Sequence, residues 1–489
     1  MDIKRRLPEL RVVHVTGTKG KGSTCAMVEA VLRASGYRTG LFTSPHLWDV
    51  RERIRINGAP VDKRVFIEHL ERVHWTLEAA GCDKVAVPAY FKFLTLLGLS
   101  IFLDSALDVV ILEVGIGGRL DATNCVPPPV AAGVAPLGFD HMELLGDTLP
   151  AIATEKAGIF KPGCVALTVG QRADAAAALA TAAARAGVPL GVVRPLADYK
   201  IAPGAPPVTL GLAGEHQRVN AALAVALAGA FEARAAADGA GPDPAAAAAR
   251  AAALARGELP TEYAAGLAAC AWHGRAEVVH DVVAGHGPSS GGSSLSFYLD
   301  GAHTPESAAT CAHWFAEAAA GAPPGGGRAP GATPDAPVVD VRLLLFNCMH
   351  EREPRRLLEP LVETLVSRGA PLAGALFAPP DSTYAKLGPG DPPADLAWQQ
   401  SLASLWQADF GAGAAGLARS VKLGPVPGPA GAAAGDAVAG AAVPSVGSAL
   451  EWLRSATRAR PGLRLKVLVT GSLYLVGDVL RHLGRGGGE

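Results

Sequence analysis

Short runs of β-branched and aliphatic residues alternate along the chain with longer stretches whose apolar residues have helical spacing. Residues 12–15, 108–112 and 165–169 are runs of the kind that forms buried strands. The segment 23–34 follows the first run with helical spacing and ends before Gly36. Strands that alternate with helices predict a parallel sheet covered by helices on both faces.

A second series of strands begins after an alanine-rich stretch at residues 236–257, which follows a helix starting near Gln217. The runs at residues 297–299, 342–346 and 465–469 predict a second, smaller sheet. A chain of 489 residues is also too long for one hydrophobic core. We therefore expect an α/β protein with two domains, residues 1–268 and residues 269–489.

Three segments rich in glycine, alanine and proline interrupt the second domain, at residues 285–294, 321–336 and about 411–441. They carry little bulky apolar material and cannot bury enough surface to offset the entropy of ordering. We interpret them as loops without function.

Composition excludes several classes of protein. The formal net charge is −1 and no basic run is longer than Lys4-Arg5-Arg6, so we expect no nucleic-acid surface. No apolar stretch reaches the roughly 20 residues of a membrane helix, so we expect no integral membrane segment, and residues 93–103 read as a buried helix. Seven cysteines without a Cys-x-x-Cys pair give no disulfide or zinc framework. Few residues precede the first strand, so no transit peptide is visible.

The strongest chemical signal is the run Gly17-Thr18-Lys19-Gly20-Lys21-Gly22-Ser23, which we call the phosphate loop. It lies between a predicted strand and a predicted helix, where glycines let backbone N–H groups point at phosphate oxygens and the helix adds its positive end. Lys21 would reach the terminal phosphates of ATP, and Ser23 the metal. Two residues separate Gly17 from Gly20, whereas the common Walker pattern has four residues between its first Gly and Gly-Lys-Ser/Thr. The plain alternative is a glycine-rich turn without a ligand.

Other candidate residues are weaker on chemistry alone. Glu113 follows a buried strand, where parallel sheets place their ligand sites, and it offers magnesium a hard oxygen, as does the Ser44 hydroxyl. His141 is an unusual magnesium ligand and would otherwise pair with Asp140. Lys156 reads as an ordinary helical lysine beside a glutamate. Asn220 either touches a nucleotide or caps a neighbouring loop.

The phosphate loop resembles that of the folylpolyglutamate synthases, relatives of the Mur ligases. Further motifs of that family follow in the same order, from Arg11 to about Pro360 and in the final strand. They are Thr43-Ser44-Pro45-His46-Leu47, Glu113-Val114-Gly115-Ile116-Gly117-Gly118-Arg119-Leu120-Asp121-Ala122-Thr123-Asn124, Asp140-His141, Leu144-Leu145-Gly146-Asp147-Thr148-Leu149, Glu155-Lys156-Ala157-Gly158-Ile159, Gly274-Arg275, Asp300-Gly301-Ala302-His303-Thr304 and Leu345-Phe346-Asn347. Lys19 and Thr304 resemble the eukaryotic branch.

This resemblance implies an N-terminal P-loop NTPase-like parallel-sheet domain and a smaller C-terminal Rossmann-like α/β domain. It implies an ATP-dependent ligase that adds L-glutamate through γ-linked amides to folate or tetrahydrofolate, through an acyl phosphate. The implied cofactors are ATP and Mg²⁺, with a monovalent cation such as K⁺ and a carbamylated Lys156. A hinge near residues 264–271 would bring the second domain to the nucleotide.

The resemblance also assigns roles to single residues. Lys21, Lys156, Arg275 and His303 would be catalytic, and Ser44, Glu113 and His141 would hold the metals. The nucleotide would be bound by Gly17, Thr18, Lys19, Gly20, Lys21, Gly22, Ser23, Asn220, Arg275 and Asp300. The plain alternative for Asp300-Gly301 is a turn that ends a strand.

Alternative functions remain open. A dihydrofolate synthase or a bifunctional enzyme would share every phosphate and metal residue, and a Mur-type ligase would share the mechanism. A regulatory nucleotide-binding protein without catalysis is a third class. We expect a monomer in the cytoplasm or the mitochondrial matrix, with plastids as a further location in the family.

Overall fold

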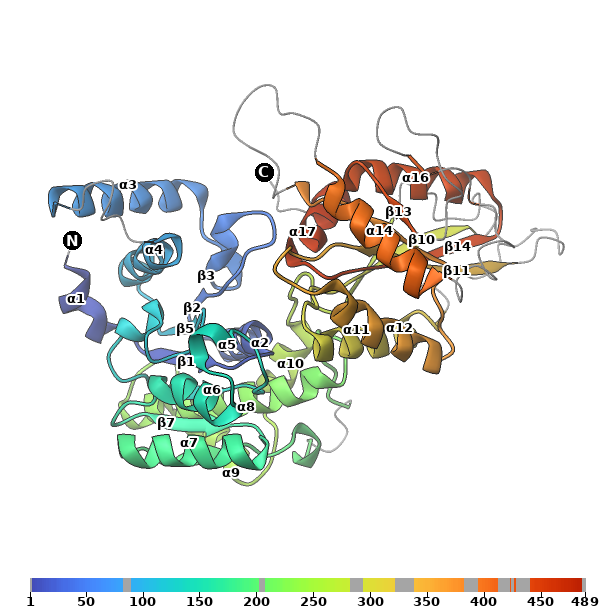
Figure 1. Cartoon of the computed structure of the whole chain (residues 1–489). Helices are drawn as coiled ribbons and strands as arrows, with labels where there is room; N and C mark the ends of the chain where they lie inside the picture. The colour runs from blue at the N-terminus through green and yellow to red at the C-terminus, as the bar shows by residue number, and fades with distance from the viewer. Residues whose placement is uncertain are drawn as a thin grey trace. The chain divides into compact units, whose positions relative to one another are not determined.

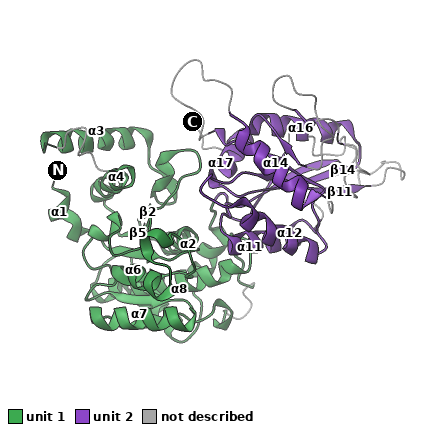
Figure 2. Cartoon of the chain, in the orientation of Figure 1, with its two compact units in different colours: residues 1–272 green, residues 273–489 purple. Residues whose placement is uncertain are grey.

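A computed structural model describes residues 2–81, 89–201, 207–281, 293–321, 338–381, 395–411, 423, 426–427 and 440–485. The chain divides into two compact units, Met1–Trp272 and His273–Glu489 (Figure 2). Each unit is described by itself below. The functions predicted for the domain at residues 1–268 and for the domain at residues 269–489 stay predictions.

The described residues of unit 1 form an eight-stranded sheet with the order β4-β3-β2-β5-β1-β6-β7-β8 (Figure 1). β2, β5, β1, β6, β7 and β8 run parallel, and β3 and β4 add an antiparallel edge. The strands are β1 Val12–Thr16, β2 Thr39–Phe42, β3 Ile54–Ile56, β4 Ala59–Pro60, β5 Val109–Glu113, β6 Ala131–Val134, β7 Val165–Thr168 and β8 Leu190–Val192. The predicted parallel sheet is confirmed, with the predicted strands shifted by one residue at most at either end.

Helices cover both faces of this sheet, because successive side chains of each strand point to opposite faces. Val13 and Val15 of β1 pack in the core formed with α2, α8 and α10. Val12 packs on the other face with α3 and α4, and α6 and α7 cover the β6 and β7 end of that face. The helices are α1 Ile3–Arg6, α2 Lys21–Ala34, α3 Lys63–Ala79, α4 Tyr90–Asp104, α5 Met142–Leu145, α6 Leu149–Lys156, α7 Ala173–Ala186, α8 His216–Ala237, α9 Pro244–Ala255 and α10 Thr261–Ala269.

One helix of the described residues, α8, is long and apolar enough to cross a membrane by length and composition. It is the helix predicted to start near Gln217, and alanine, rather than leucine or valine, supplies most of its apolar character. In the structure 61% of its most apolar window is buried, and it packs against α2, α9, β6 and β7. Its hydrophobicity therefore serves the core of unit 1.

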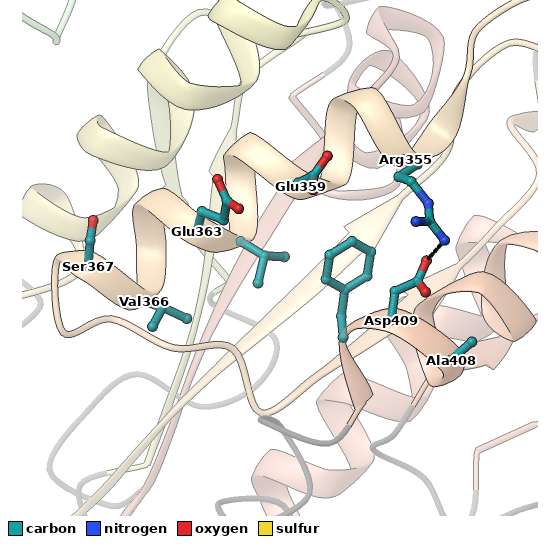
Figure 3. A pocket seen from close by; sticks show the side chains of 9 residues that line it. Arg355, Glu359, Glu363, Val366, Ser367, Ala408 and Asp409 are labelled. Carbon is teal, nitrogen blue, oxygen red and sulfur yellow. Dashed lines mark hydrogen bonds and ion pairs between the residues drawn. The ribbon is translucent and has the colours of Figure 1, made fainter.

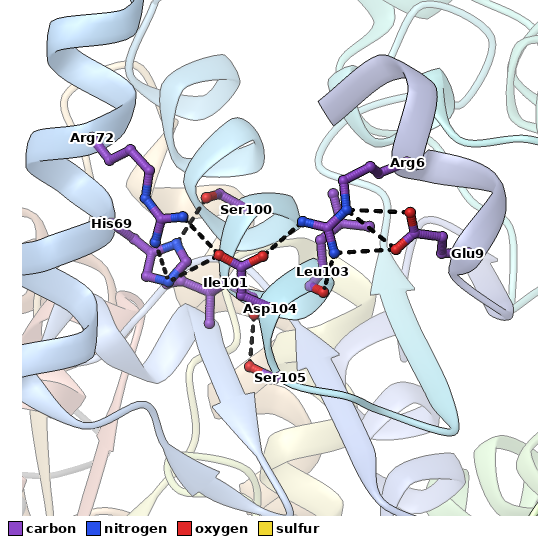
Figure 4. Close-up of polar contacts among 9 residues, drawn as sticks. All are labelled: Arg6, Glu9, His69, Arg72, Ser100, Ile101, Leu103, Asp104 and Ser105. Atoms are coloured by element: carbon purple, nitrogen blue, oxygen red, sulfur yellow. Dashed lines mark hydrogen bonds and ion pairs between the residues drawn. The ribbon is translucent and has the colours of Figure 1, made fainter. Parts of the chain in front are cut away.

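A polar network ties the first helical segment to α3 and α4 (Figure 4). The Asp104 carboxylate accepts from Arg6 and from Arg72, each at 2.7 Å. Burial alone would raise the pKa of Asp104, but these two hydrogen bonds hold it below its ordinary value. Arg72 also donates to His69 Nε2 at 2.9 Å, so His69 Nδ1 carries the proton and donates to Ser100. The network holds α1, α3 and α4 together beside β2 and β5, with which α3 and α4 share a hydrophobic core.

Unit 2 contains a second sheet, in the order β13-β12-β11-β14-β10-β9 among the described residues. All of its strands pair in parallel except β9, which is antiparallel to β10. Its core contains α11, α12 and α14 on one face, and α16 and α17 contact β14. The elements are β9 Glu277–His280, β10 Ser294–Leu299, α11 Pro305–Ala318, β11 Val339–Phe346, α12 Pro354–Ser367, β12 Gly374–Phe377, α14 Ala397–Asp409, β13 Ala441–Ala442, α16 Val446–Ala459, β14 Leu463–Thr470 and α17 Leu473–His482. The α/β fold class, with a second and smaller sheet, is confirmed.

The predicted hinge near residues 264–271 includes the second half of α10 and ends directly before Trp272, where unit 1 ends. Movement at that place stays a prediction. The glycine- and alanine-rich segments lie mostly outside the described residues. Where the third is described, Leu423 and Val426 are buried and its end forms β13, so that segment does contribute to the fold.

Candidate active site

The phosphate loop connects β1 to α2, as predicted, but its amides are not all available to a ligand. The N–H groups of Thr18 and Lys19 donate to Pro136 O at 3.0 and 3.1 Å, and Thr18 Oγ1 donates to Gly138 O. Gly20 is left-handed, with φ +75°, and α2 begins at Lys21. The first N–H groups of a helix have no acceptor within it. The amides of Lys21, Gly22 and Ser23 are therefore those best suited to an anion.

Asn220 lies directly against this loop. A Cβ atom on Gly20 would stand 2.1 Å from Asn220 Oδ1, and the φ of +75° favours glycine as well, so another residue there would be strained and would displace the Asn220 side chain. Asn220 Nδ2 donates to Gln217 Oε1 at 2.9 Å, and Gln217 Nε2 donates to Ser23 Oγ at 3.5 Å. α8 thus supports the phosphate loop through a buried chain of amides, and the contact of Asn220 with a nucleotide stays a prediction.

Glu113 ends β5 with its carboxylate buried beside the first turn of α2. Its Oε2 accepts the backbone N–H of Ser44 at 2.9 Å. Both of its oxygens lie 3.6 Å from the point where a Cβ on Gly22 would stand. The structure therefore brings Glu113, Ser44 and the start of α2 together, as the sequence predicted, and gives this corner hard oxygen donors of the kind that magnesium prefers.

The backbone of the segment that carries Ser44 is shaped by Glu52, which the sequence analysis missed. The buried Glu52 carboxylate accepts the N–H groups of Leu47, Trp48 and Asp49 at 2.8–3.1 Å. Asp49 and Glu52 form a capping box, and their Asp-x-x-Glu spacing is the signal that could have revealed it.

His141 has a strained backbone, with φ +51° and ψ +41°, and heads the short helix α5. Such a conformation is uncommon outside glycine and is frequent at functional sites. Its ring nitrogens lie 3.8 Å from Asp140 Oδ2 and 3.8 Å from Glu143 Oε1. Within the described ranges no three His, Cys, Asp or Glu side chains are grouped so as to hold a metal ion. The role of His141 as a ligand stays a prediction.

Lys156, at the end of α6, reaches the phosphate loop although it lies 139 residues further along the chain. Its Nζ is buried and donates to Gly17 O at 2.9 Å. Burial, aided by the charge of Lys21, lowers the pKa of Lys156 to about 7. Lys156 is therefore no ordinary surface lysine, because a large share of its amine is neutral at neutral pH.

The 115–124 loop joins the Glu113 side of the site to the Lys156 side. Thr16 Oγ1 donates to Gly117 O at 2.6 Å, and Arg119 N donates to Glu155 O at 2.9 Å. A Cβ on Gly118 would stand 2.5 Å from Lys156 O, so the loop packs closely on α6 only because that residue is glycine.

In unit 2 the residues assigned by resemblance gather at the carboxyl end of β10. Asp300 Oδ2 accepts the N–H of Ala276 at 2.9 Å, and Arg275 donates to Gly274 O at 3.1 Å. Ala276 is left-handed, with φ +48°. A Cβ on Gly301 would stand 2.2 Å from Leu473 Cδ2 and 2.9 Å from Arg275 NH1, so Gly301 leaves room for both side chains.

His303 belongs to the same cluster and has a defined tautomer. Its Nδ1 lies 2.8 Å from Gly301 O, and a carbonyl oxygen only accepts, so Nδ1 carries the proton. The next residue, Thr304, caps α11 with Ser307. The structure thus brings Arg275, Asp300 and His303 together within unit 2.

A groove elsewhere on unit 2 contains none of the predicted site residues. It has a volume of about 690 Å³ and lies between α12 and α14, with Glu359, Glu363 and Phe410 in its lining and the Arg355–Asp409 ion pair at one end (Figure 3).

Comparison with known proteins decides the family. Folylpolyglutamate synthase of Arabidopsis thaliana is 42% identical to this chain over 516 residues, covering 99% of the chain and 81% of that protein. The chain belongs to the folylpolyglutamate synthase family. The mitochondrial folylpolyglutamate synthase of Homo sapiens is 43% identical over 73% of the chain and 57% of its own length.

Solved structures agree on the fold of the family. The Mycobacterium tuberculosis folylpolyglutamate synthase complexed with ADP and AMPPCP superposes with a TM-score of 0.67 at 23% identity, covering 99% of this chain and 93% of that one. No family model matches the sequence. The resemblance drawn from the motifs is therefore confirmed at the level of the family.

Proposed function

We propose that this chain is an ADP-forming tetrahydrofolate:L-glutamate γ-ligase, which adds glutamate through γ-linked amides to the tail of folate. The observation that carries the proposal is the placement of Glu113 and Lys156 on either side of the phosphate loop. Membership of the folylpolyglutamate synthase family supports the choice of reaction.

The reaction has two steps. A carboxylate oxygen of the folate tail attacks the γ-phosphorus of ATP, the bond to the bridging oxygen breaks, and ADP and an acyl phosphate result. The amine of free glutamate then attacks the acyl carbon and loses a proton. Phosphate leaves with the oxygen that came from the tail, and an amide remains.

Unit 1 positions the reacting groups of the first step and neutralises their charge. Phosphoryl-transfer enzymes obtain most of their catalysis from these two effects. The amides at the start of α2 and the Lys21 ammonium neutralise the phosphate oxygens. Gly20 keeps the turn open beside Asn220, and Lys156 fixes the carbonyl of Gly17. Lys19 and Thr18 complete the loop.

Mg²⁺ fits the corner formed by Glu113, Ser44 and Ser23, because that corner offers one carboxylate and two hydroxyls and magnesium retains waters besides. When bound, the ion neutralises charge on the phosphates. His141 is assigned to the metals by resemblance, as is the use of a monovalent cation such as K⁺.

Lys156 is suited to carbamylation, because carbon dioxide reacts only with the neutral amine. The carbamate nitrogen keeps a hydrogen that can still donate to Gly17 O, while the new carboxylate offsets the charge of Lys21. Activity should therefore fall in preparations stripped of carbon dioxide and return with bicarbonate. Lys156→Ala should be weak and partly restored by short-chain carboxylic acids. An active enzyme in which both the intact mass and the electron density show an unmodified lysine would contradict this.

Arg275, Asp300 and His303 are assigned to the reaction by resemblance, Arg275 to the phosphates and Asp300 to the nucleotide. Their clustering at the carboxyl end of β10, where parallel sheets bind ligands, supports a functional role. Arg275→Lys keeps the positive charge and removes the planar guanidinium. A loss of activity in that variant would therefore favour a bidentate contact between Arg275 and a phosphate group.

The acceptor separates this proposal from a dihydrofolate synthase or a bifunctional enzyme, which would share the ATP and metal residues. Lys19, His303-Thr304 and Tyr90-Phe91-Lys92-Phe93-Leu94-Thr95 resemble the eukaryotic folylpolyglutamate branch. Purified protein should release ADP in the presence of glutamate and tetrahydrofolate, and release little with dihydropteroate. Equal rates would indicate the bifunctional enzyme, and ATP binding without turnover would indicate a regulatory protein.

The location and assembly of the protein are also proposals. A cytoplasmic or mitochondrial-matrix enzyme is consistent with the mitochondrial name of the human relative. We expect a monomer, which size-exclusion chromatography with light scattering would test.

A further inference from the structure

His14 lies in the middle of β1, two residues before Thr16, and nothing proposed above uses it. Its side chain is fully buried. Residues two apart on a strand face the same side, so His14 and Thr16 both face the 115–124 loop, which they contact through Thr123 and Gly117. Burial, aided by the charge of Lys161, lowers the pKa of His14 to about 3, so the ring is neutral and carries a single N–H at neutral pH.

The direction of each hydrogen bond from His14 follows from its partners. His14 Nε2 lies 2.8 Å from Thr123 Oγ1, which lies 2.5 Å from Asp121 Oδ1. The carboxylate oxygen of Asp121 accepts, so the Thr123 hydroxyl donates its hydrogen bond to Asp121 and accepts one from His14. The ring proton is therefore on Nε2, which agrees with Nδ1 having no partner among the described residues.

The second oxygen of Asp121 holds the backbone directly after Glu113. Asp121 Oδ2 accepts the N–H groups of Gly115 and Ile116, each at 3.1 Å. Val114 N donates to Val15 O, which continues the pairing of β5 with β1 up to that point. A relay of side chains thus begins at His14 in β1, passes through Thr123 and Asp121, and ends at the backbone two and three residues after Glu113 of β5.

We propose that His14 is a positioning residue: through Thr123 and Asp121 it fixes the backbone after Glu113 and so aims that carboxylate at the magnesium ion. The proposal rests on the proposed function, in which Glu113 holds magnesium for the ATP-dependent step. If His14 only filled space in the core, the hydroxyl of Thr123 would matter for stability alone.

The test compares Thr123→Val, which keeps the shape and removes the hydroxyl, with Thr123→Ser, which keeps the hydroxyl. Partners of metal-ligating residues typically contribute about 10- to 100-fold to metal affinity or activity. Thr123→Val should therefore raise the magnesium concentration for half-maximal activity about tenfold, and speed amide exchange at Gly115 and Ile116. Thr123→Ser should stay near wild type in both measurements.

Thr457→Val is the matched control, because Thr457 is as fully buried as Thr123 and donates to a backbone carbonyl, Leu453 O. It should lower the melting temperature without changing the magnesium requirement. If Thr123→Val folds poorly, His14→Gln, whose amide N–H can reach Thr123, should keep the wild-type magnesium requirement, whereas His14→Leu should not.

The proposal would be overturned if Thr123→Val and Thr123→Ser had the same magnesium requirement and the same rates of amide exchange at Gly115 and Ile116. A wild-type protein without magnesium-dependent glutamate addition would instead overturn the proposed function. Amide exchange at Gly115 and Ile116 would then still decide whether the relay holds the loop.

Discussion

Replacing Lys156 by methionine should change how the stability of unit 1 depends on pH. Methionine has a similar length and no charge. The pKa of Lys156 falls from 10.5 to about 7 in the folded chain, first because of burial and then because of Lys21. Below pH 7 the amine is protonated in both the folded and the unfolded chain, and the folded chain bears the full cost of burying the charge. Between pH 7 and 10.5 only the unfolded chain keeps the proton, so stability rises with pH in that window.

The size of the effect follows from these two pKa values. Linkage gives wild type a gain of about 1.4 kcal/mol in the free energy of unfolding between pH 6 and pH 8. Lys156→Met lacks this gain, so the difference in stability between wild type and variant should change by that amount. Other titrating groups are common to both proteins and cancel.

Native-state amide exchange of α2 and α6, corrected for intrinsic exchange rates, reports the opening free energy of unit 1. Buffers free of carbon dioxide prevent carbamylation of the neutral amine. Lys63→Met, at an exposed lysine on α3, serves as the control and should run parallel to wild type. If Lys156→Met also runs parallel to wild type between pH 6 and 8, the amine is not held neutral and the argument for its carbamylation fails.

Three further predictions concern the phosphate loop and its neighbours. Lys21→Ala should lower kcat/KM at least about a hundredfold, which corresponds to about 2.7 kcal/mol, and leave the melting temperature close to wild type; activity within a few-fold of wild type would contradict its assignment. Glu113→Gln keeps an oxygen for the Ser44 N–H and removes the charge that attracts the cation, so it should raise the magnesium requirement sharply, and an unchanged magnesium titration would count against it. Gly20→Ala should weaken binding of a non-hydrolysable ATP analogue in calorimetry, because its Cβ would stand 2.1 Å from Asn220 Oδ1 and would displace that side chain from the phosphate loop. Gly187→Ala, also at positive φ but in open space, should bind normally.

The arrangement of strands and helices around the phosphate loop could be predicted from the sequence, because hydrophobic periodicity is a local property. The apolar runs before Gly17 and Glu113 form β1 and β5 in the structure. Both residues lie at the carboxyl edge of the sheet, where a parallel sheet binds ligands. The placement of Glu113 beside Ser44 was expected only from the family resemblance, because the sequence analysis predicted no strand before Ser44, and the structure explains it by the pairing of β2 with β5.

Contacts between distant segments could not be predicted in this way. Lys156 reads as an ordinary helical lysine until the fold brings its amine to Gly17 O. The sequence also gives no sign that Pro136 O occupies the Thr18 and Lys19 amides, because that contact depends on the path of the loop after β6. His14 was read as part of a strand, and only its buried hydrogen bond to Thr123 distinguishes it from its aliphatic neighbours.

The central claim is that ATP activates a carboxylate of the folate tail, and the fate of the oxygen atoms tests it directly. Tetrahydrofolate whose terminal γ-carboxylate is labelled with oxygen-18 is incubated with the protein, ATP, magnesium and glutamate, and the released phosphate is analysed by mass spectrometry. One labelled oxygen should appear in inorganic phosphate for each amide formed, and none in the absence of glutamate-dependent turnover. Amide formation with no label in phosphate would contradict the acyl phosphate, and the absence of amide product would contradict the proposed function.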